Sequence, residues 1–370
     1  MIKLLAIFAI AMVFAHSSAK RERRTLRNWD YDQKIIKDSG YIFVIIALVL
    51  FTGLRIDYND TYTYWRTFVN SSDTVSDVLH NWNWTDNPAM ELYKAVIRQF
   101  STDKTALIFP ASMFTQFCLI RFFKKYSVEF DFSVYLFFTL GMFCFTMGAM
   151  KQSVAIGILT FAVEAAEKKK WVKFALLVFL AFLFHTYAIV LIVTPFLRAR
   201  PWSAFTWLMT IGAVIVFMNL EPILGSVIDA AEDAGKKIYE DEILGGTGSN
   251  ILRILVYAVP PVISFVYRKR LFADSKPVEN IMVHLSILSF ACMAYGLVVS
   301  GNEADRLATY FEMGTVVSLP WMIKKGFPKQ TGNAVKTIAY AAFFFFFIYK
   351  FGLKGNFDGD YRSIIYRYIG

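Results

Sequence analysis

Cysteine is scarce in this chain, because only Cys118, Cys144 and Cys292 occur and each lies inside an apolar run. Cysteines in such places exclude the disulfide framework that stabilises many small secreted domains. We therefore expect all of them to pack as small hydrophobic side chains.

Charged residues are also few, at 18% of the chain, whereas hydrophobic residues reach 56% and the mean hydropathy is +0.45. This composition excludes an ordinary soluble domain. Apolar runs of roughly 15 to 20 residues recur along the sequence, which is the length that crosses a bilayer as a helix. The chain lacks ten-residue segments of alternating polarity, which excludes a membrane β-barrel. The sequence thus predicts an all-α polytopic membrane bundle with about 11–12 transmembrane or partial-span helices.

Acidic residues are outnumbered, with 29 Asp and Glu against 39 Lys and Arg, so the net charge is +10. The excess basic residues lie in short loops between apolar runs, where they set membrane topology. We therefore expect the lipid bilayer, and no nucleic acid, as the partner of this basic surface.

The first apolar run, residues 2–16, is followed by Ser17-Ser18-Ala19, which resembles the cleavage site of a signal peptide. The flanking charges are reversed, however, because the basic residues concentrate after the run, between residues 20 and 27. This reversal favours a retained first helix, with the N-terminus outside and segment 20–37 in the cytoplasm.

The further predicted spans are 40–54, 104–120, 132–148, 151–166, 204–220, 251–267, 280–299, 307–323 and 334–349. Region 171–197 could be one tilted helix or a hairpin of two short arms that turns at His185. A single crossing would place the basic segment 268–270 outside, whereas a hairpin returns every later basic loop to the cytoplasm. We therefore predict the hairpin, with His185 near its outer tip and both chain termini outside.

We expect residues 1–370 to form one integral membrane domain with two large outer loops. Loop 55–103 is rich in Trp and Tyr, which suits helices that lie at the membrane interface. Loop 221–250 is acidic and ends in a Gly-rich segment that is flexible by composition.

Ionisable side chains from separate parts of the chain fall on the outer face in this topology. They are Arg55, Asp57, Asp60, Lys151, His185, Glu303, Asp305 and Arg306. Ionisable groups embedded in apolar segments are costly in a bilayer and mark candidate functional sites. The cytoplasmic loops hold mainly Lys and Arg of the kind that sets topology. We therefore expect the chemistry of this protein to face outward.

Each of these residues also has a structural explanation. Arg55 and Arg306 could anchor helix ends to lipid headgroups, and Lys151 could reach the interface with its long side chain. Asp60 could be the N-cap of the helix that follows it. His185 could be a hydrogen-bonded core residue. Their convergence on one face is what favours a site.

The order of these residues resembles the EpsG family, the Wzy-like polysaccharide polymerases. The first motif of that family is an Arg at the end of an early span, followed by Asp, Tyr and Phe. Here these are Arg55, Asp60, Tyr64 and Phe68. The glycine that often precedes the family's Asp is missing, so Asp57 is an alternative, but the spacing to Tyr64 favours Asp60.

Three further motifs extend the resemblance over most of the chain. They are Lys151-Gln152 opening a span, Phe184-His185 ending an apolar segment, and Asp305-Arg306 followed by Tyr310. The family usually has Arg before the Gln. Lys151 keeps the positive charge but loses the bidentate guanidinium fork.

The resemblance implies a glycosyltransferase of the bacterial inner membrane, similar to the C-type enzymes, with an active site on the extracytoplasmic side. Such an enzyme moves a growing glycan from undecaprenyl diphosphate to a hydroxyl of the next lipid-linked repeat unit, in exopolysaccharide, capsule or O-antigen synthesis. The implied partners are the undecaprenyl-diphosphate-linked oligosaccharide, a chain-length regulator and other glycan-assembly proteins.

This reaction needs a base for the acceptor hydroxyl and fixed positive charge for the departing diphosphate. The resemblance implies Asp60 or His185 as the base, with the other residue orienting it or the acceptor. The implied substrate-binding residues are Arg55, Lys151, Gln152, Arg306, Tyr64 and Tyr310.

No cofactor is expected, and no metal, because the histidines are scattered and no cluster has the spacing of metal ligands. A pair of outward-facing aspartates is the alternative for a divalent ion. Two other functions stay open from the residues: a glycan ligase that uses the same donor, and a transporter of lipid-linked oligosaccharide. A transporter should show internal repeats and binding residues at mid-membrane, and the sequence has neither.

Overall fold

The computed structural model describes residues 1–25, 31, 38–71, 74–84, 86–208, 250–297 and 301–367. It divides into two compact units, Met1–Pro195 with Gln330–Gly370, and Phe196–Lys329. Most of the predicted span 204–220 and of the acidic loop 221–250 lies outside the described residues, as does most of segment 26–37.

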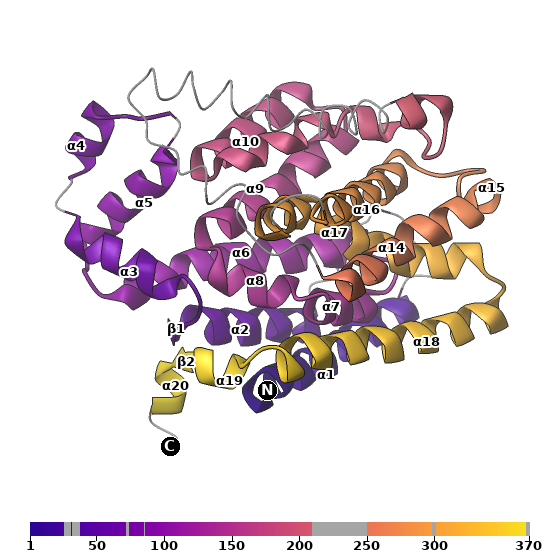
Figure 1. The fold of residues 1–370 in the computed structure, drawn as a ribbon, viewed down its shortest axis with the longest axis horizontal. Coiled ribbons are helices and arrows are strands. Elements are labelled where there is room, and N and C mark those ends of the chain that lie inside the picture. Colours follow the sequence, from indigo (N-terminus) through magenta and orange to yellow (C-terminus); the bar gives the residue numbers. More distant parts are fainter. Residues whose placement is uncertain are drawn as a thin grey trace. The chain divides into compact units, whose positions relative to one another are not determined.

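Helices make up nearly all of the first unit (Figure 1). Its longer helices are α1 (Ile2–Thr25), α2 (Ser39–Gly53), α6 (Lys104–Tyr126), α7 (Phe130–Thr139), α9 (Met150–Glu167), α10 (Trp171–Phe184) and α18 (Lys329–Ile348). The shorter elements between α2 and α10 are β1 (Arg55–Asp57), α3 (Thr61–Asn70), α4 (Val75–His80), α5 (Pro88–Arg98) and α8 (Met142–Gly148). After α10 and α18 come η1 (Thr186–Val193), η3 (Tyr349–Leu353), α19 (Phe357–Asp360), β2 (Arg362–Ser363) and α20 (Ile364–Arg367).

The second unit is also helical. It contains η2 (Phe196–Arg198), α14 (Ile251–Val266), α15 (Arg268–Leu271), α16 (Pro277–Tyr295) and α17 (Gly301–Gly326). Helices α16 and α17 approach closely at Gly314, where a Cβ atom would lie 2.6 Å from the carbonyl oxygen of Met282. A larger residue at this position would separate the two helices.

Within the described residues, four helices are long and apolar enough to cross a membrane. They are Ile2–Arg24, Lys104–Tyr126, Pro277–Tyr295 and Lys329–Leu353, and the bent pair α7–α8 counts as a fifth. Helices α2, α10 and α14 are apolar but shorter. The predicted all-α polytopic bundle is therefore confirmed.

The predicted span 132–148 is wrong in one respect, because it is not one straight helix. Helices α7 and α8 meet at an angle of 57°. The break falls at Gly141, whose φ of 96° is open to glycine but strained for other residues. The ammonium group of Lys350 donates a hydrogen bond of 3.2 Å to the carbonyl of Leu140, which the break leaves without a helical partner.

The three cysteines are buried and free, as predicted. The predicted break at His185 is also confirmed, because α10 ends at Phe184 and a 3₁₀ helix, η1, follows. Helix η1 contacts both α10 and α9. At 14 residues, α10 is about 21 Å long, which is less than the hydrocarbon core of a bilayer.

The C-terminal segment of the first unit is fastened to the end of α2. Strands β1 and β2 pair antiparallel, with Arg55 opposite Ser363 (Figure 1). The Tyr361 hydroxyl donates to the carbonyl of Phe51 at 2.7 Å, and the two rings stack with centroids 4.4 Å apart. This pairing holds Arg55 at the point where the chain leaves α2.

Candidate functional site

Arg55 is the most deeply buried cation among the predicted site residues, with 1% of its surface exposed. Its Nε donates to the hydroxyl of Thr61 at 3.1 Å, and one terminal nitrogen donates to Ser112 Oγ at 2.9 Å and to the carbonyl of Thr52. All of these acceptors are neutral. Within the described residues, Arg55 forms no ion pair. Burying a cation without a counter-ion is costly, so its charge is available to an anionic ligand.

Hydroxyl groups make the surroundings of Arg55 polar. The phenols of Tyr361, Tyr64 and Tyr58 lie close enough to interact electrostatically with the guanidinium. Burial lowers the pKa of Arg55 to about 10, which still leaves the side chain protonated at neutral pH. The site therefore carries a fixed positive charge.

An apolar cavity of about 330 Å³ lies between α5, α6, α9 and α10. Its lining residues are Tyr93, Pro110, Ala111, Phe114, Val154, Ile158, Leu180 and Phe184. Its volume is in the range of small-molecule sites. The cavity borders three of the predicted motifs in sequence: Ala111 precedes Ser112, Val154 lies one turn after Lys151, and Phe184 precedes His185.

Asp60 occupies the N-cap position of α3 but does not act as a cap. Its backbone is helical, and its side chain accepts no capping hydrogen bond. The carboxylate is half-buried and, within the described residues, forms no ion pair. The side chain of Asp60 therefore does not cap α3, in contrast to the structural explanation offered from the sequence.

The turn that carries Asp60 contacts the turn between α8 and α9. Asn59 has a left-handed φ of 51°, and its side chain lies so close to Gly148 that a Cβ atom there would meet Asn59 Nδ2 at 2.7 Å. Helix α9 begins two residues later, and its first turn carries Lys151 and Gln152, as predicted. The half-buried Lys151 and the buried Gln152 therefore open their helix beside the Asp60 turn.

His185 is the C-cap residue of α10 and has an extended backbone, with φ −157° and ψ 119°. Its ring meets Tyr187 edge-on, with ring centroids 5.4 Å apart. The next residue joins this break to loop 55–103, since the Thr186 N–H donates to the side-chain oxygen of Asn87 at 3.3 Å. His185 is thus held at the end of α10 that borders the cavity.

Loop 55–103 folds into helices α3, α4 and α5, and some of its aromatic side chains stay accessible. Trp84 is 56% exposed and lies near Phe179 of α10, with ring centroids 6.1 Å apart. Tyr62 is 55% exposed and packs at an angle on Trp65. Such exposed ring faces are suited to stacking against sugar rings.

The Asp305-Arg306 motif lies in the second unit, at the start of α17. Asp305 forms an ion pair with Arg253 of α14. Arg306 is exposed, whereas Tyr310 is fully buried one turn further on. The motif therefore combines a neutralised carboxylate with an accessible guanidinium.

Sequence reasoning missed three residues of this second cluster: Arg253, Tyr257 and Glu312. The Tyr257 hydroxyl donates to the carboxylate of Glu312, and both side chains are buried. The signal was present in the sequence, because Arg253 and Glu312 are single ionisable residues inside predicted spans.

The structure thus places Arg55 near Tyr64, and the turn that carries Asp60 beside the start of α9 with Lys151 and Gln152. His185 lies at the end of α10 that borders the cavity. Arg306 and Tyr310 lie one turn apart on α17 in the second unit. No group of three His, Cys, Asp or Glu side chains within the described residues could hold a metal ion.

A helical membrane protein with a buried, uncompensated cation beside an apolar cavity is suited to an amphiphilic anion. The model of the EpsG family matches residues 40–363, which is most of the chain. The chain belongs to the EpsG family, and this membership implies the role of a Wzy-like polysaccharide polymerase. No curated protein and no solved structure matches the chain.

Proposed function

We propose that this protein polymerises lipid-linked oligosaccharide repeat units on the extracytoplasmic side of the bacterial cytoplasmic membrane. It transfers the growing glycan from undecaprenyl diphosphate to a hydroxyl of the next repeat unit. The observation that carries this proposal is the buried Arg55, whose hydrogen-bond partners within the described residues are all neutral and which bonds to Ser112 of α6, a helix that lines the apolar cavity.

Arg55 and Lys151 bind the diphosphate of the donor in this proposal. Arg55 supplies a guanidinium that is already desolvated, so its interaction with a developing negative charge is stronger than in water. Lys151 adds a second positive charge on the first turn of α9. Gln152 and Tyr64 donate hydrogen bonds to phosphate or sugar oxygens.

The cavity between α6, α9 and α10 receives the first part of the polyprenyl chain. Its lining is almost entirely apolar, and the Arg55–Ser112 hydrogen bond lies one residue from the lining residue Ala111. A ligand that bridges the two must carry a charged head on an apolar chain. A polyprenyl diphosphate has this chemistry.

The chemical step forms one bond and breaks one. The oxygen of the acceptor hydroxyl attacks the anomeric carbon of the donor sugar, and the bond from that carbon to the diphosphate oxygen breaks. Undecaprenyl diphosphate leaves with the electron pair. The hydroxyl proton passes to the Asp60 carboxylate or to neutral His185, each of which is a suitable base.

Arg306 and Tyr310 are the contribution of the second unit. The Asp305–Arg253 ion pair neutralises the carboxylate next to Arg306. The exposed guanidinium of Arg306 is suited to phosphate or glycan oxygens.

The test is complementation of glycan assembly in cells that lack the chromosomal copy, with lipid-linked products separated by size. Arg55→Ala, Asp60→Asn, His185→Ala and Arg306→Ala should reach the membrane and accumulate single repeat units without a ladder. Asp86→Asn and His80→Ala, which change the same residue types at exposed positions outside the proposed site, should restore the ladder.

Three other results would contradict the proposal. A full ladder in all four site variants would show that these residues are structural. Single units confined to the cytoplasmic leaflet would identify a transporter. A normal ladder that is not attached to its final acceptor would identify a ligase.

A further inference from the structure

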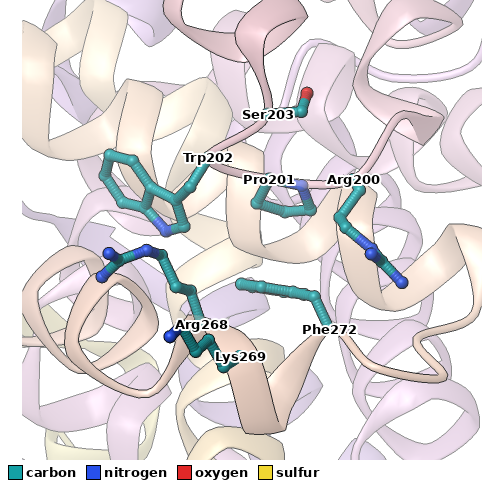
Figure 2. Close-up of a pocket in the computed structure, with 7 residues that line it drawn as sticks. All are labelled: Arg200, Pro201, Trp202, Ser203, Arg268, Lys269 and Phe272. Carbon is teal, nitrogen blue, oxygen red and sulfur yellow. The ribbon is translucent and has the colours of Figure 1, made fainter.

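The second unit contains a basic pocket that the proposed polymerase reaction does not use. It has a volume of about 190 Å³ and lies between residues 200–203 and the segment that begins with α15. Figure 2 shows Trp202 and Arg200 on one wall, and Arg268, Lys269 and Phe272 on the facing wall. No acidic residue of the described part of the chain lines it.

The three cations of this pocket have no acidic partner among the residues that the structure describes. Arg200 donates to the carbonyl of Ala273 at 3.1 Å, and Arg268 donates to the carbonyl of Phe265 at 2.8 Å. Both acceptors are neutral, and Arg200, Arg268 and Lys269 form no ion pair within the described residues. The nearest acidic residue along the chain, Asp274, is paired with Lys325. The pocket therefore has an excess of positive charge that an anion would balance.

The wall formed by Trp202 is held in a fixed position. Trp202 has a left-handed φ of 61°, which an aromatic residue rarely adopts. Its indole N–H donates to the hydroxyl of the buried Ser264 at 3.0 Å, and its ring meets Phe265 edge-on. These contacts maintain a strained backbone conformation and keep the pocket open.

Exposed apolar surface adjoins the cations. Val262, Phe265 and Val266 on the last turn of α14 are 57%, 40% and 61% exposed. Arg268 lies over the Phe265 ring, with its guanidinium carbon 4.4 Å from the ring centroid. A ligand that satisfies both features carries an anionic head and an apolar chain.

We propose that this pocket binds the phosphate group of an anionic membrane lipid. Arg268 and Lys269 contact the phosphate oxygens, Trp202 and Phe272 flank the headgroup, and the acyl chains follow the exposed face of α14. The guanidinium fork and the ammonium group are both suited to phosphate oxygens. The sequence places this end of α14 on the cytoplasmic side, so the lipid belongs to the cytoplasmic leaflet. The proposal is independent of the polymerase reaction.

The test measures lipid binding to the purified full-length protein by native mass spectrometry. Phosphatidylglycerol is titrated against the wild type and against Arg268→Gln/Lys269→Gln. The control is Arg270→Gln/Lys324→Gln, which also removes one Arg and one Lys. Both of these residues are exposed and do not line the pocket.

We expect the pocket variant to bind phosphatidylglycerol at least about tenfold more weakly, because it loses two charge-assisted hydrogen-bonding groups. The control should change the affinity less than about twofold, since screened surface charges contribute little. Equal losses in both variants would overturn the proposal, because they would show general attraction to a basic surface.

Soluble glycerol 1-phosphate separates a lipid from a free phosphate compound. If it binds as tightly as phosphatidylglycerol and shows the same loss in the pocket variant, the ligand is a soluble phosphate and the lipid assignment is wrong. Weak binding of glycerol 1-phosphate, with strong binding of the lipid, supports the assignment.

Discussion

Each of the two units of this protein contains an arginine that is largely removed from water. The two arginines differ in whether a carboxylate balances their charge. Arg55 in the first unit is almost fully buried, and only neutral oxygens accept its hydrogen bonds. Arg253 in the second unit is 17% exposed and pairs with the carboxylate of Asp305. The first arginine keeps its net charge, whereas the second is neutralised within its own unit.

This difference distinguishes a binding cation from a supporting one. An uncompensated buried charge lowers the stability of the folded state, so its presence calls for a functional explanation. A paired charge joins two helices, here α14 and α17, and needs no ligand. We therefore expect substitutions of Arg55 to affect catalysis first and substitutions of Arg253 to affect stability first.

The largest expected effect follows from replacing Arg55 by Met, which keeps an unbranched apolar stem and removes the guanidinium charge. Polymer formation should fall by about 10²–10³-fold, the usual loss when one stabilising donor is removed from a charged transition state. In Arg55→Lys, polymer formation should fall about tenfold, because the positive charge stays and the guanidinium fork is lost. Turnover of purified lipid-linked repeat units by detergent-solubilised protein checks both values.

Ser112→Ala is the control for Arg55. It removes one hydrogen bond to the guanidinium, a loss of about 1 kcal/mol, and leaves the charge in place. If Ser112→Ala reduces turnover as much as Arg55→Met does, the position of Arg55 matters and its charge does not.

The second prediction concerns the ion pair of the second unit. Arg253→Gln and Asp305→Asn should each lower the free energy of unfolding by about 1–2 kcal/mol. The pair is partly exposed, at 17% and 26%, so the effect lies between those of surface and buried pairs. The double variant should be no less stable than either single variant, as a double-mutant cycle in detergent unfolding can measure. Strictly additive losses would show that the two residues do not interact.

The third prediction tests the cavity beside Arg55. Ala111→Phe fills space that the polyprenyl chain occupies in our proposal, and we expect about tenfold lower turnover, equivalent to about 1.4 kcal/mol. Met113→Phe places the same ring on an exposed position of α6 and should have little effect. With a donor that has a very short prenyl chain, Ala111→Phe and Met113→Phe should change the turnover equally, because such a chain does not occupy the cavity. If Ala111→Phe also lowers the turnover of the short donor selectively, the assignment of the cavity to the polyprenyl chain is contradicted.

The sequence predicted the fold class because the length and repetition of apolar runs are local properties. The break at His185 was predictable too, since it follows from the side on which the basic loops must lie. The break at Gly141 was not. It depends on Lys350, which comes from a distant part of the chain and satisfies the freed carbonyl of Leu140.

The candidate site was predictable as residues but not as geometry. The sequence identified candidate residues by their order along the chain: Arg55, Asp60, Lys151 and His185. Their positions in space depend on contacts between distant segments. The pairing of β1 with β2 joins the ends of a long stretch of chain, and no local pattern specifies such a partner. Arg253 and Asp305 carried a signal, but only the packing of α14 and α17 shows that they pair.

We expect the smallest effect at the exposed ion pair between Asp274 and Lys325. The hydrogen bond from Lys325 holds the pKa of Asp274 below its ordinary value of 3.8. The unfolded chain therefore binds a proton at higher pH than the folded chain does. The stabilising contribution is present above the ordinary carboxyl range and is lost as the pH falls below it.

Because Asp274 is 81% exposed, solvent screens this pair, and Asp274→Asn should lower the Tm at pH 7 by less than about 1 °C. The wild type and the variant should converge as the pH falls below about 3.8. Thermal unfolding of both proteins across this pH range is the measurement, with Asp305→Asn as the reference for a more buried pair. If Asp274→Asn lowers the Tm as much as Asp305→Asn does, exposure is not what separates the contribution of the Asp274–Lys325 pair from that of the Asp305–Arg253 pair.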